Sequence, residues 1–393
     1  MSLRVLALGS SGGGGDWPPL AAVISELIAR GHAVSCLGDE ALVRAAAGTR
    51  LEIEAVPRER DLPYYMQAWE EESKRDPAAP LPIPRWTEDL LPLALEHARR
   101  VRPEVLICQD FTLRLASALR RELGVPVGLV HGTFYTGRDA KRRVQEDYTA
   151  QMIEAMRGRR TGLFDGDPPD LTLIASDARF DPPPDAPPQN NHWVGPLLWE
   201  PAAAVPEYLS APGDPWALVT LSSHRQPGEL ALGRAALDAL APFPVRTLLT
   251  LGDVSLHDEI GALPANARVE RFVPHKAVLE RAALCVSHAG HGIVGKCMHY
   301  GVPMVLVPWD RDQPGVAGRA EALGIARVVR REKLSAEALG AAIRAALADD
   351  AMRARCAEHG ARLRTSDASA TACALIEALG RATKPNASPC SGT

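Results

Sequence analysis

Two groups of residues in this chain have the types and spacing to bind and activate a substrate. Asp16 follows a run of glycines and stands where the first predicted strand passes into a helix. An aspartate there can serve as a general base, and it is also a favoured helix N-cap, so the sequence leaves both roles open. The second group occupies 288–313, where a histidine and glycines precede a predicted helix, and an aspartate and a glutamine follow the next apolar run.

The turn at 288–293 has the composition of an anion-binding site. Gly290 and Gly292 let a ligand approach the backbone. The free N–H groups at the start of the following helix favour negative charge, so a phosphate is the expected ligand. His288 can donate a further hydrogen bond, although a single histidine at a strand end is more often a structural residue.

Two further strand ends carry polar side chains. Asp312 and Gln313 follow an apolar strand and precede a predicted helix, so they can bracket a polyol by hydrogen bonds. The sequence DRD at 310–312 is similar to a DxD metal motif, but its context favours hydrogen bonding without a metal, and a solvated loop is the alternative. Ser222 and Ser223 end another predicted strand, where the alternative is a plain turn.

The elements that must position these residues form two α/β series. Apolar runs at 3–8 and 33–37 flank a predicted helix that begins at prolines and stops near Gly31, and a second series of strands begins at 216. Near-continuous apolar strands are typical of parallel sheets covered on both faces. We therefore expect two doubly wound, Rossmann-like parallel-sheet domains that face a cleft, with ligands beyond the carboxyl ends of the strands.

Two proline-rich stretches interrupt this pattern. The region 57–103 is predicted to be irregular, and its aromatic residues favour a role in shaping a pocket. The passage at 181–196 is predicted to be the linker or its approach, because its prolines resist both helix and sheet. Residues 383–393 are predicted to form a disordered tail.

Length and composition limit the class of protein. A chain of 393 residues favours two domains, and a formal net charge of -4 argues against a nucleic-acid partner. No apolar run approaches the roughly 18 residues of a membrane span, and the opening does not resemble a signal peptide, so we expect a cytoplasmic protein. The seven cysteines are scattered without a C-x-x-C pair, which suits a reducing compartment and argues against zinc.

Several motifs occur together in the last third of the chain. HAGHG, YGVPMVLVP, DQ and ALGIARVV follow one another within 283–329. Upstream lie FVPHKAVL at 272–279 and GDWPPLAAVISELIARGHAV at 15–34. In this order and spacing the set resembles the GT-B-fold natural-product glycosyltransferases, a group that includes macrolide, glycopeptide-antibiotic and sterol glycosyltransferases. The resemblance covers most of the chain except 57–103 and the tail.

This resemblance implies an acceptor-binding domain at 1–195 and a nucleotide-sugar donor-binding domain at 196–382. The donor would be a UDP- or dTDP-sugar acting as co-substrate, with no other cofactor and no metal. The implied donor-binding residues are Ser222, Ser223, Val273, His288, Ala289, Gly290, His291, Gly292, Ile293, Asp312 and Gln313. Ile293 departs from the family pattern, which often has serine or threonine there, and His291 could compensate for the missing phosphate contact.

The resemblance also places Asp16 at the position of the family's catalytic base. It implies an inverting, metal-independent hexosyl transfer to a hydroxyl of a hydrophobic natural-product aglycone, as in antibiotic or other secondary-metabolite biosynthesis. Asp110 is expected to raise the pKa of Asp16 or to partner a histidine such as His131. An aspartate of ordinary pKa, about 3.9, is a weak base, which favours a phenolic or enolic acceptor. The candidate acceptor-binding residues are Trp17, Trp69, Phe111, His131 and Phe134.

Two other functions stay open at this point. A GT-B-fold sugar-nucleotide epimerase would act without an acceptor, although the aromatic residues in 57–103 favour a hydrophobic acceptor. A catalytically silent sugar-nucleotide-binding homologue would keep the fold without turnover, and the departure at Ile293 makes it conceivable. The sequence is equally compatible with a monomer and a homodimer.

Overall fold

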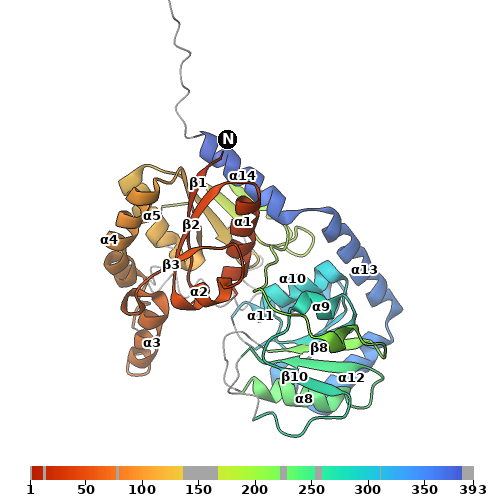
Figure 1. The fold of residues 1–393 in the computed structure, drawn as a ribbon. Helices are drawn as coiled ribbons and strands as arrows, with labels where there is room; N and C mark the ends of the chain where they lie inside the picture. The colour runs from red at the N-terminus through yellow and green to blue at the C-terminus, as the bar shows by residue number, and fades with distance from the viewer. Residues whose placement is uncertain are drawn as a thin grey trace, which may run out of the picture.

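The chain folds into two lobes, shown in the computed structural model of Figure 1. Each lobe is built on its own β-sheet, and the lobes are covalently linked where the chain leaves the first sheet and where the last helices return to it. The structure describes residues 2–11, 15–76, 79–135, 167–221, 228–252, 259–309 and 311–382.

The first sheet contains seven parallel strands within the described residues, in the order β3-β2-β1-β4-β5-β6-β7. The strand order reverses between β1 and β4, and ligands of such sheets bind in the crevice at the carboxyl ends of the strands there. The strands are β1 (Arg4–Leu8), β2 (Ala33–Gly38), β3 (Ile53–Ala55), β4 (Val105–Gln109), β5 (Val127–His131), β6 (Leu171–Ile174) and β7 (Asn191–Trp193).

Helices cover both faces of the first sheet. In β1, Val5 and Ala7 face the core that contains α1, whereas Leu6 and Leu8 face the core that contains α4 and α5. A strand buried on both faces must be apolar throughout, which explains the unbroken run in β1. The elements are α1 (Trp17–Ala29), α2 (Glu40–Ala46), η2 (Arg58–Arg60), α3 (Leu62–Ser73), α4 (Ile83–Val101), η3 (Asp110–Thr112) and α5 (Leu113–Leu123).

The second sheet has six parallel strands among the described residues, in the order β10-β9-β8-β11-β12-β13. Its strands are β8 (Trp216–Thr220), β9 (Arg246–Thr250), β10 (Ala267–Glu270), β11 (Ala282–Ser287), β12 (Met304–Leu306) and β13 (Ala326–Val328). Helices α8 and α12 pack together, and α10 packs against α9 and α13. The helical elements are η4 (Glu207–Ser210), α8 (Leu230–Leu240), α9 (His275–Leu279), α10 (His291–Tyr300), α11 (Gln313–Ala322), η6 (Arg331–Lys333), α12 (Ala336–Leu347) and α13 (Asp350–Thr365).

The prediction of two doubly wound parallel-sheet domains is confirmed. The prediction of an irregular region at 57–103 is wrong, because α3 and α4 lie within it. Both helices have a proline in their first turn, where a helix does not need the backbone N–H that proline lacks. The passage at 181–196 is also more ordered than predicted, since β7 pairs with β6 at the edge of the first sheet.

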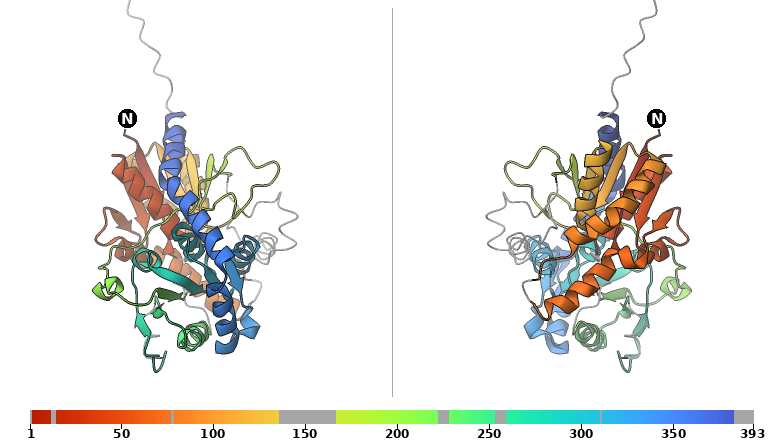
Figure 2. Two further views of the ribbon diagram at one scale, coloured as in Figure 1. Left: turned by 90° about the vertical axis from the view of Figure 1, so that its right-hand side faces the viewer. Right: turned by 90° about the vertical axis from the view of Figure 1, so that its left-hand side faces the viewer.

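The last helix of the chain returns to the first lobe. Helix α14 (Ala368–Ala382) packs against α1 and β6, and its Cys373 and Ile376 belong to the core beneath α1. Figure 2 shows α13 and α14, in blue, running along one side of both lobes. The predicted domain boundary between residues 195 and 196 stays a prediction. As folded, the first lobe also includes α14, which lies far beyond that boundary in the sequence. The predicted tail at 383–393 lies outside the described residues.

The described helices and cysteines bear on two expectations drawn from composition. None of the described helices is both long enough and apolar enough to cross a membrane. Every cysteine among the described residues is a free thiol buried in the protein. A thiol in such apolar surroundings behaves as a small hydrophobic side chain.

Candidate functional site

Asp16 lies at the first strand-to-helix turn, directly before α1. A helix cap would accept hydrogen bonds from the next N–H groups, but Pro18 and Pro19 have none, and within the described residues the side chain of Asp16 makes no capping bond. The side chain lies instead against Gly132, which follows β5. A β-carbon on Gly132 would be 3.0 Å from Oδ1 of Asp16 and 3.1 Å from its Cα. Asp16 is therefore a partly buried carboxylate beside the carboxyl end of β5.

Asp110 and His131 form a buried pair beside Asp16. Nδ1 of His131 lies 2.8 Å from Oδ1 of Asp110, and Nε2 lies 2.9 Å from the carbonyl oxygen of Phe134. A carboxylate and a carbonyl both accept hydrogen bonds, so both ring nitrogens carry protons and the ring is an imidazolium. Burial alone would lower the pKa of His131, but the charge and hydrogen bond of Asp110 and the Phe134 carbonyl raise it to about 9.

The surroundings of Asp16 favour its protonated form. Burial raises the pKa of Asp16 most, and the nearby carboxylates Asp110 and Asp312 raise it further, to about 8. The positive charges of His131 and Arg311 act in the opposite direction. When ionised, a carboxylate with a pKa near 8 is a much stronger base than an ordinary aspartate. This cluster therefore has the properties of a general base that operates in mildly alkaline solution.

The second lobe reaches the same cluster through the loop between β12 and α11. The hydroxyl of Thr133, just after β5, donates a 2.7 Å hydrogen bond to Oδ2 of Asp312. The charge of Asp312 also acts on Asp16. A predicted sugar-binding residue of one lobe and the predicted base of the other thus lie close enough to interact where the two lobes meet.

Helix α10 begins beside the first lobe. Its first residue, His291, has Nε2 3.4 Å from the hydroxyl of Ser176 in the first lobe, and its ring meets that of Phe180 edge to face at 6.0 Å. Burial is the main cause that lowers the pKa of His291 to about 3, and a backbone hydrogen bond with Gly132 opposes it. The ring is therefore neutral at physiological pH and brings no positive charge to the start of α10.

His288 lies at the end of β11 with its ring over the start of α10. A β-carbon on Gly290 would be 2.6 Å from Nε2 of His288, so only glycine leaves room for the ring. Between them, Ala289 is fully buried and has φ of 66°, a left-handed conformation that favours glycine. Burial lowers the pKa of His288 to about 4, with a hydrogen bond to the Thr220 backbone acting in the opposite direction. The turn therefore combines backbone N–H groups with a neutral histidine.

Other predicted donor-site residues lie around this turn. Gly292 is exposed in the first turn of α10, whereas Ile293 is buried in the core of the second lobe. Val273 is also buried in that core. Oε1 of Gln313 accepts a 2.8 Å hydrogen bond from the Trp309 N–H, which ties the start of α11 to the end of the preceding segment. The predicted residues Ser222 and Ser223 lie outside the described residues.

The five predicted acceptor residues are not brought together in one pocket. Trp17 is buried in the core of the first lobe, where its ring packs edge to face with Trp199 at 6.1 Å. Phe134 is buried beneath the guanidinium of Arg319, 3.8 Å above its ring centre. His131 is engaged by Asp110 as described above.

The remaining two acceptor candidates lie on the other side of the first sheet. Phe111 and Trp69 are partly buried and pack against the core formed with α4 and α5. Nε1 of Trp69 donates a 3.1 Å hydrogen bond to the carbonyl of Ala79. These contacts hold α3 and the loop after it in place, and the roles of these aromatic residues in acceptor binding stay predictions.

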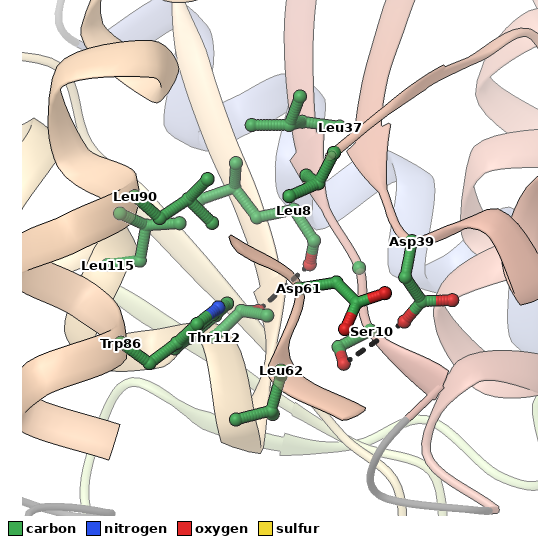
Figure 3. A pocket seen from close by; sticks show the side chains of 12 residues that line it. Leu8, Ser10, Leu37, Asp39, Asp61, Leu62, Trp86, Leu90, Thr112 and Leu115 are labelled. Carbon is green, nitrogen blue, oxygen red and sulfur yellow. Dashed lines mark hydrogen bonds between the residues drawn. The ribbon is translucent and has the colours of Figure 1, made fainter. Parts of the chain in front are cut away.

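A small cavity lies at the carboxyl ends of β1 and β2, bounded by α3 and α4 (Figure 3). Apolar side chains such as Leu90 line much of it, and two buried aspartates lie on its polar side. Asp39 binds the N–H of Ser11 at 2.6 Å and that of Leu42 at 3.1 Å. Asp61 accepts a 2.8 Å hydrogen bond from the N–H of Tyr64. Both carboxylates cap helices, which accounts for their burial without a catalytic role.

Gly132, Thr133 and Glu229 are not among the residues predicted from the sequence. Gly132 and Thr133 directly follow a buried strand, so the rule that ligands lie beyond strand ends could have found them. Glu229 precedes α8 and is buried beside His288; no motif in the sequence marks it. Within the described part of the chain, no group of three or more histidine, cysteine, aspartate or glutamate side chains is arranged to hold a metal ion.

Comparison with protein families gives a match in the second lobe. Residues 234–376 match the family described as erythromycin biosynthesis protein CIII-like, C-terminal domain. These residues include most of α8, the elements from β9 to α13 and the turn that carries His288. The turn described above therefore lies inside the region shared with that family.

Whole proteins similar to this chain are also glycosyltransferases or biosynthetic enzymes. The chain is 28% identical to O-mycaminosyltylonolide 6-deoxyallosyltransferase of Streptomyces fradiae, over 96% of this chain and 97% of that protein. It is 29% identical to 4'-demethylrebeccamycin synthase of Lentzea aerocolonigenes, over 54% of this chain and only 50% of that protein. The crystal structure of the glycosyltransferase VinC in complex with dTDP shares the fold, with a TM-score of 0.70, 20% identity, and coverage of 96% of this chain and 100% of that one. The chain therefore has the GT-B fold, its second lobe matches the erythromycin biosynthesis protein CIII-like family, and the relatives and solved structures that it resembles include macrolide and antibiotic glycosyltransferases.

Proposed function

We propose that this protein transfers a hexose, with inversion and without a metal, from a UDP- or dTDP-sugar to a hydroxyl of a hydrophobic natural-product aglycone. The observation that carries this proposal is that Asp16 of one lobe and Asp312 of the other are close enough for the charge of Asp312 to raise the pKa of Asp16, while Thr133 binds Asp312 across the boundary between the lobes. The dTDP found with VinC supports a dTDP-type donor, because the two proteins share the fold.

Asp16 is the general base in this proposal. It removes the proton of the acceptor hydroxyl while the acceptor oxygen forms a bond to the anomeric carbon from the face opposite the diphosphate. Burial and the charges of Asp110 and Asp312 raise the pKa of Asp16 to about 8. That value lies within about two units of a phenol, whose pKa is about 10. The pKa of Asp16 is therefore well matched to a phenolic or enolic acceptor. Because it is a stronger base than an ordinary aspartate, it also removes the proton of an alcohol more readily.

The pair of Asp110 and His131 is proposed to hold the geometry and charge around this base. The N–H of Gly132 donates a 3.4 Å hydrogen bond to Oδ2 of Asp110, so the carboxylate spans the histidine and the backbone against which Asp16 lies. The imidazolium stabilises the ionised form of Asp16, because its charge lowers the pKa of that carboxyl. The pair thus limits how far burial can suppress the base.

The turn from 288 to 293 is proposed to bind the donor diphosphate. The bond between the anomeric carbon and the diphosphate oxygen breaks as the glycosidic bond forms, and the electron pair leaves with the nucleoside diphosphate. The N–H groups at the start of α10 and the ring of His288 stabilise this charge. Asp312 and Gln313 are proposed to hold sugar hydroxyls, Val273 to meet the base through its backbone, and Ser222 and Ser223 to complete the phosphate site. These groups supply the charge stabilisation that a metal supplies in other enzymes.

The proposal is tested with donor alone and then with donor plus a panel of phenolic and alcohol aglycones. Release of nucleoside diphosphate that requires an acceptor, with a glycoside seen by mass spectrometry, supports transfer. Isomerised sugar without an acceptor would indicate an epimerase, and binding without turnover a silent homologue. Asp16→Asn should lower kcat by about 10²- to 10⁴-fold with donor saturated, and near wild-type turnover would refute the base. Asp185→Asn, at an exposed position, is the matched control.

A further inference from the structure

A buried carboxylate faces the predicted phosphate-binding histidine from behind. Oε1 of Glu229, at the start of α8, lies 3.6 Å from Nδ1 of His288. His288 is 8% exposed and Glu229 only 4%. Nδ1 is buried and has no hydrogen-bond partner among the described residues. Burying a ring nitrogen without a hydrogen bond next to a buried carboxylate costs free energy unless the two groups interact with each other.

The two nitrogens of the His288 ring face different environments. Nδ1 faces Glu229, whereas Nε2 lies toward Gly290 at the start of α10, where the diphosphate is proposed to bind. The other described charge near the ring is Arg311, in the loop before α11. Burial lowers the pKa of His288 to about 4. The ring is therefore neutral in the absence of ligand and carries a single proton on one of its nitrogens.

The Glu229 carboxylate, 3.6 Å from Nδ1, and the Thr220 backbone beside the ring both act on which nitrogen holds that proton. A proton on Nδ1 of His288 points toward the Glu229 oxygen and is stabilised by it, whereas a lone pair there would be repelled. Nε2 is then left with its lone pair directed toward the diphosphate site. Phosphate oxygens accept hydrogen bonds and cannot bond to a lone pair, so binding requires a second proton at Nε2.

We propose that Glu229 is a positioning residue of the donor site, which holds a proton on Nδ1 of His288 so that the ring takes up a second proton at Nε2 when a nucleoside diphosphate binds. This inference rests on the proposed function, because it assumes that the diphosphate lies at the start of α10. The imidazolium formed is flanked by Glu229 on one side and by phosphate on the other. Binding then draws one proton from solvent, and affinity falls up to tenfold for each unit of rising pH.

The test is isothermal titration calorimetry of dTDP and of UDP in buffers of different ionisation enthalpy, between pH 7.5 and 8.5, where the phosphate groups of the probes, with a last pKa of about 6, are ionised. All proteins carry Asp16→Asn, since Asp16 itself titrates near pH 8. With Glu229 present, we expect uptake of about one proton per diphosphate bound. Glu229→Gln should bring the uptake close to zero and weaken binding about tenfold at pH 7.5.

Two further variants make this result specific. His288→Asn should also abolish proton uptake, because asparagine does not titrate, and this holds even if Glu229→Gln folds poorly. Glu337→Gln, at an exposed position on α12, removes the same charge elsewhere and should leave uptake and affinity unchanged. Equal uptake with glutamate and glutamine at 229, or no uptake in either, would overturn the role of Glu229 while leaving the proposed function intact. If neither dTDP nor UDP binds, the proposed function falls as well.

Discussion

The two groups of residues at the carboxyl ends of the sheets, one in each lobe, are placed alike but differ in their chemistry. In the first lobe, the residues after β1, β4 and β5 form a charged cluster of two carboxylates and an imidazolium. In the second lobe, the turn after β11 offers backbone N–H groups and histidines whose pKa values burial lowers to about 4 and about 3. The first group is suited to moving a proton and the second to holding an anion.

The difference follows from what the histidines contact. His131 has a carboxylate on one nitrogen and a carbonyl on the other, so its positive charge is stabilised despite burial. His288 and His291 are also largely enclosed, but no carboxylate within the described residues lies at hydrogen-bond distance from either ring, so desolvation dominates. The fold places a histidine near each strand end, and its partners decide whether it is a cation or a neutral ligand.

The largest predicted effect concerns the group in the second lobe, at the start of α10. In Gly290→Ala, the new methyl group would lie 2.6 Å from Nε2 of His288. That atom is the end of a side chain, so the ring moves and the protein still folds. The loss of one hydrogen bond to a charged phosphate should weaken dTDP or UDP binding about 10- to 100-fold, measured by calorimetry. Gly318→Ala on α11 has open space around its β-carbon and serves as the control; equal affinities for both variants would refute the site.

A smaller effect is expected in the first lobe, where a substitution should lower kcat without changing the binding of the diphosphate. In Gly132→Ala, the methyl group would lie 3.0 Å from the Asp16 carboxylate, which must shift by a few tenths of an ångström. Displacing a base in this way should lower kcat about tenfold and leave the affinity for nucleoside diphosphate unchanged. Gly128→Ala, within β5, which directly precedes Gly132, has ordinary contacts at 3.7 Å and should keep kcat. A loss of diphosphate affinity in Gly132→Ala would show that the two groups of residues do not act separately.

The sequence predicts much of this arrangement because the ends of the buried strands can be recognised from their apolar runs. Buried apolar runs identify β1, β2, β4, β5, β8 and β11, and the polar residues at the ends of β1, β4 and β5, namely Asp16, Asp110 and His131, lie together in the folded chain. The same reasoning misses α3 and α4, since Pro63 and Pro84 resemble helix breakers although both stand in a first turn. The N-cap alternative for Asp16 could also have been excluded, because the two prolines that follow Trp17 offer no N–H.

The pairings within the site could not be predicted. The bond between His131 and Asp110 requires β4 and β5 to be neighbours in register. The bond between Thr133 and Asp312 joins residues 179 positions apart and depends on how one lobe sits on the other. Local pattern carries no information about such contacts. For the same reason, the burial that sets the pKa of Asp16 is visible only in the folded chain.

Two substitutions should shift the pH profile of kcat in opposite directions. The base must be ionised to act, so kcat should rise with pH through a midpoint near 8, the pKa of Asp16. His131→Gln removes a positive charge that lowers this pKa, so the midpoint should move up. Asp312→Asn removes a negative charge that raises it, so the midpoint should move down. Each shift should be about one unit, a tenfold effect on rate at fixed pH near 7. Shifts of the same sign would show that the cluster is not governed by these charges.

The smallest predicted effect concerns the backbone of the turn between β11 and α10. Ala289 is held at φ of 66°, which costs an L-residue about 1 kcal/mol, and Ala289→Gly removes that cost while adding freedom to the unfolded chain. The net effect should be a gain of about 0.5 kcal/mol in the free energy of unfolding, measured with urea. Ala342→Gly, inside α12, should instead lose about 1 kcal/mol. If both variants were destabilised alike, the turn would carry no strain, and its buried alanine would matter only for the close approach of a diphosphate.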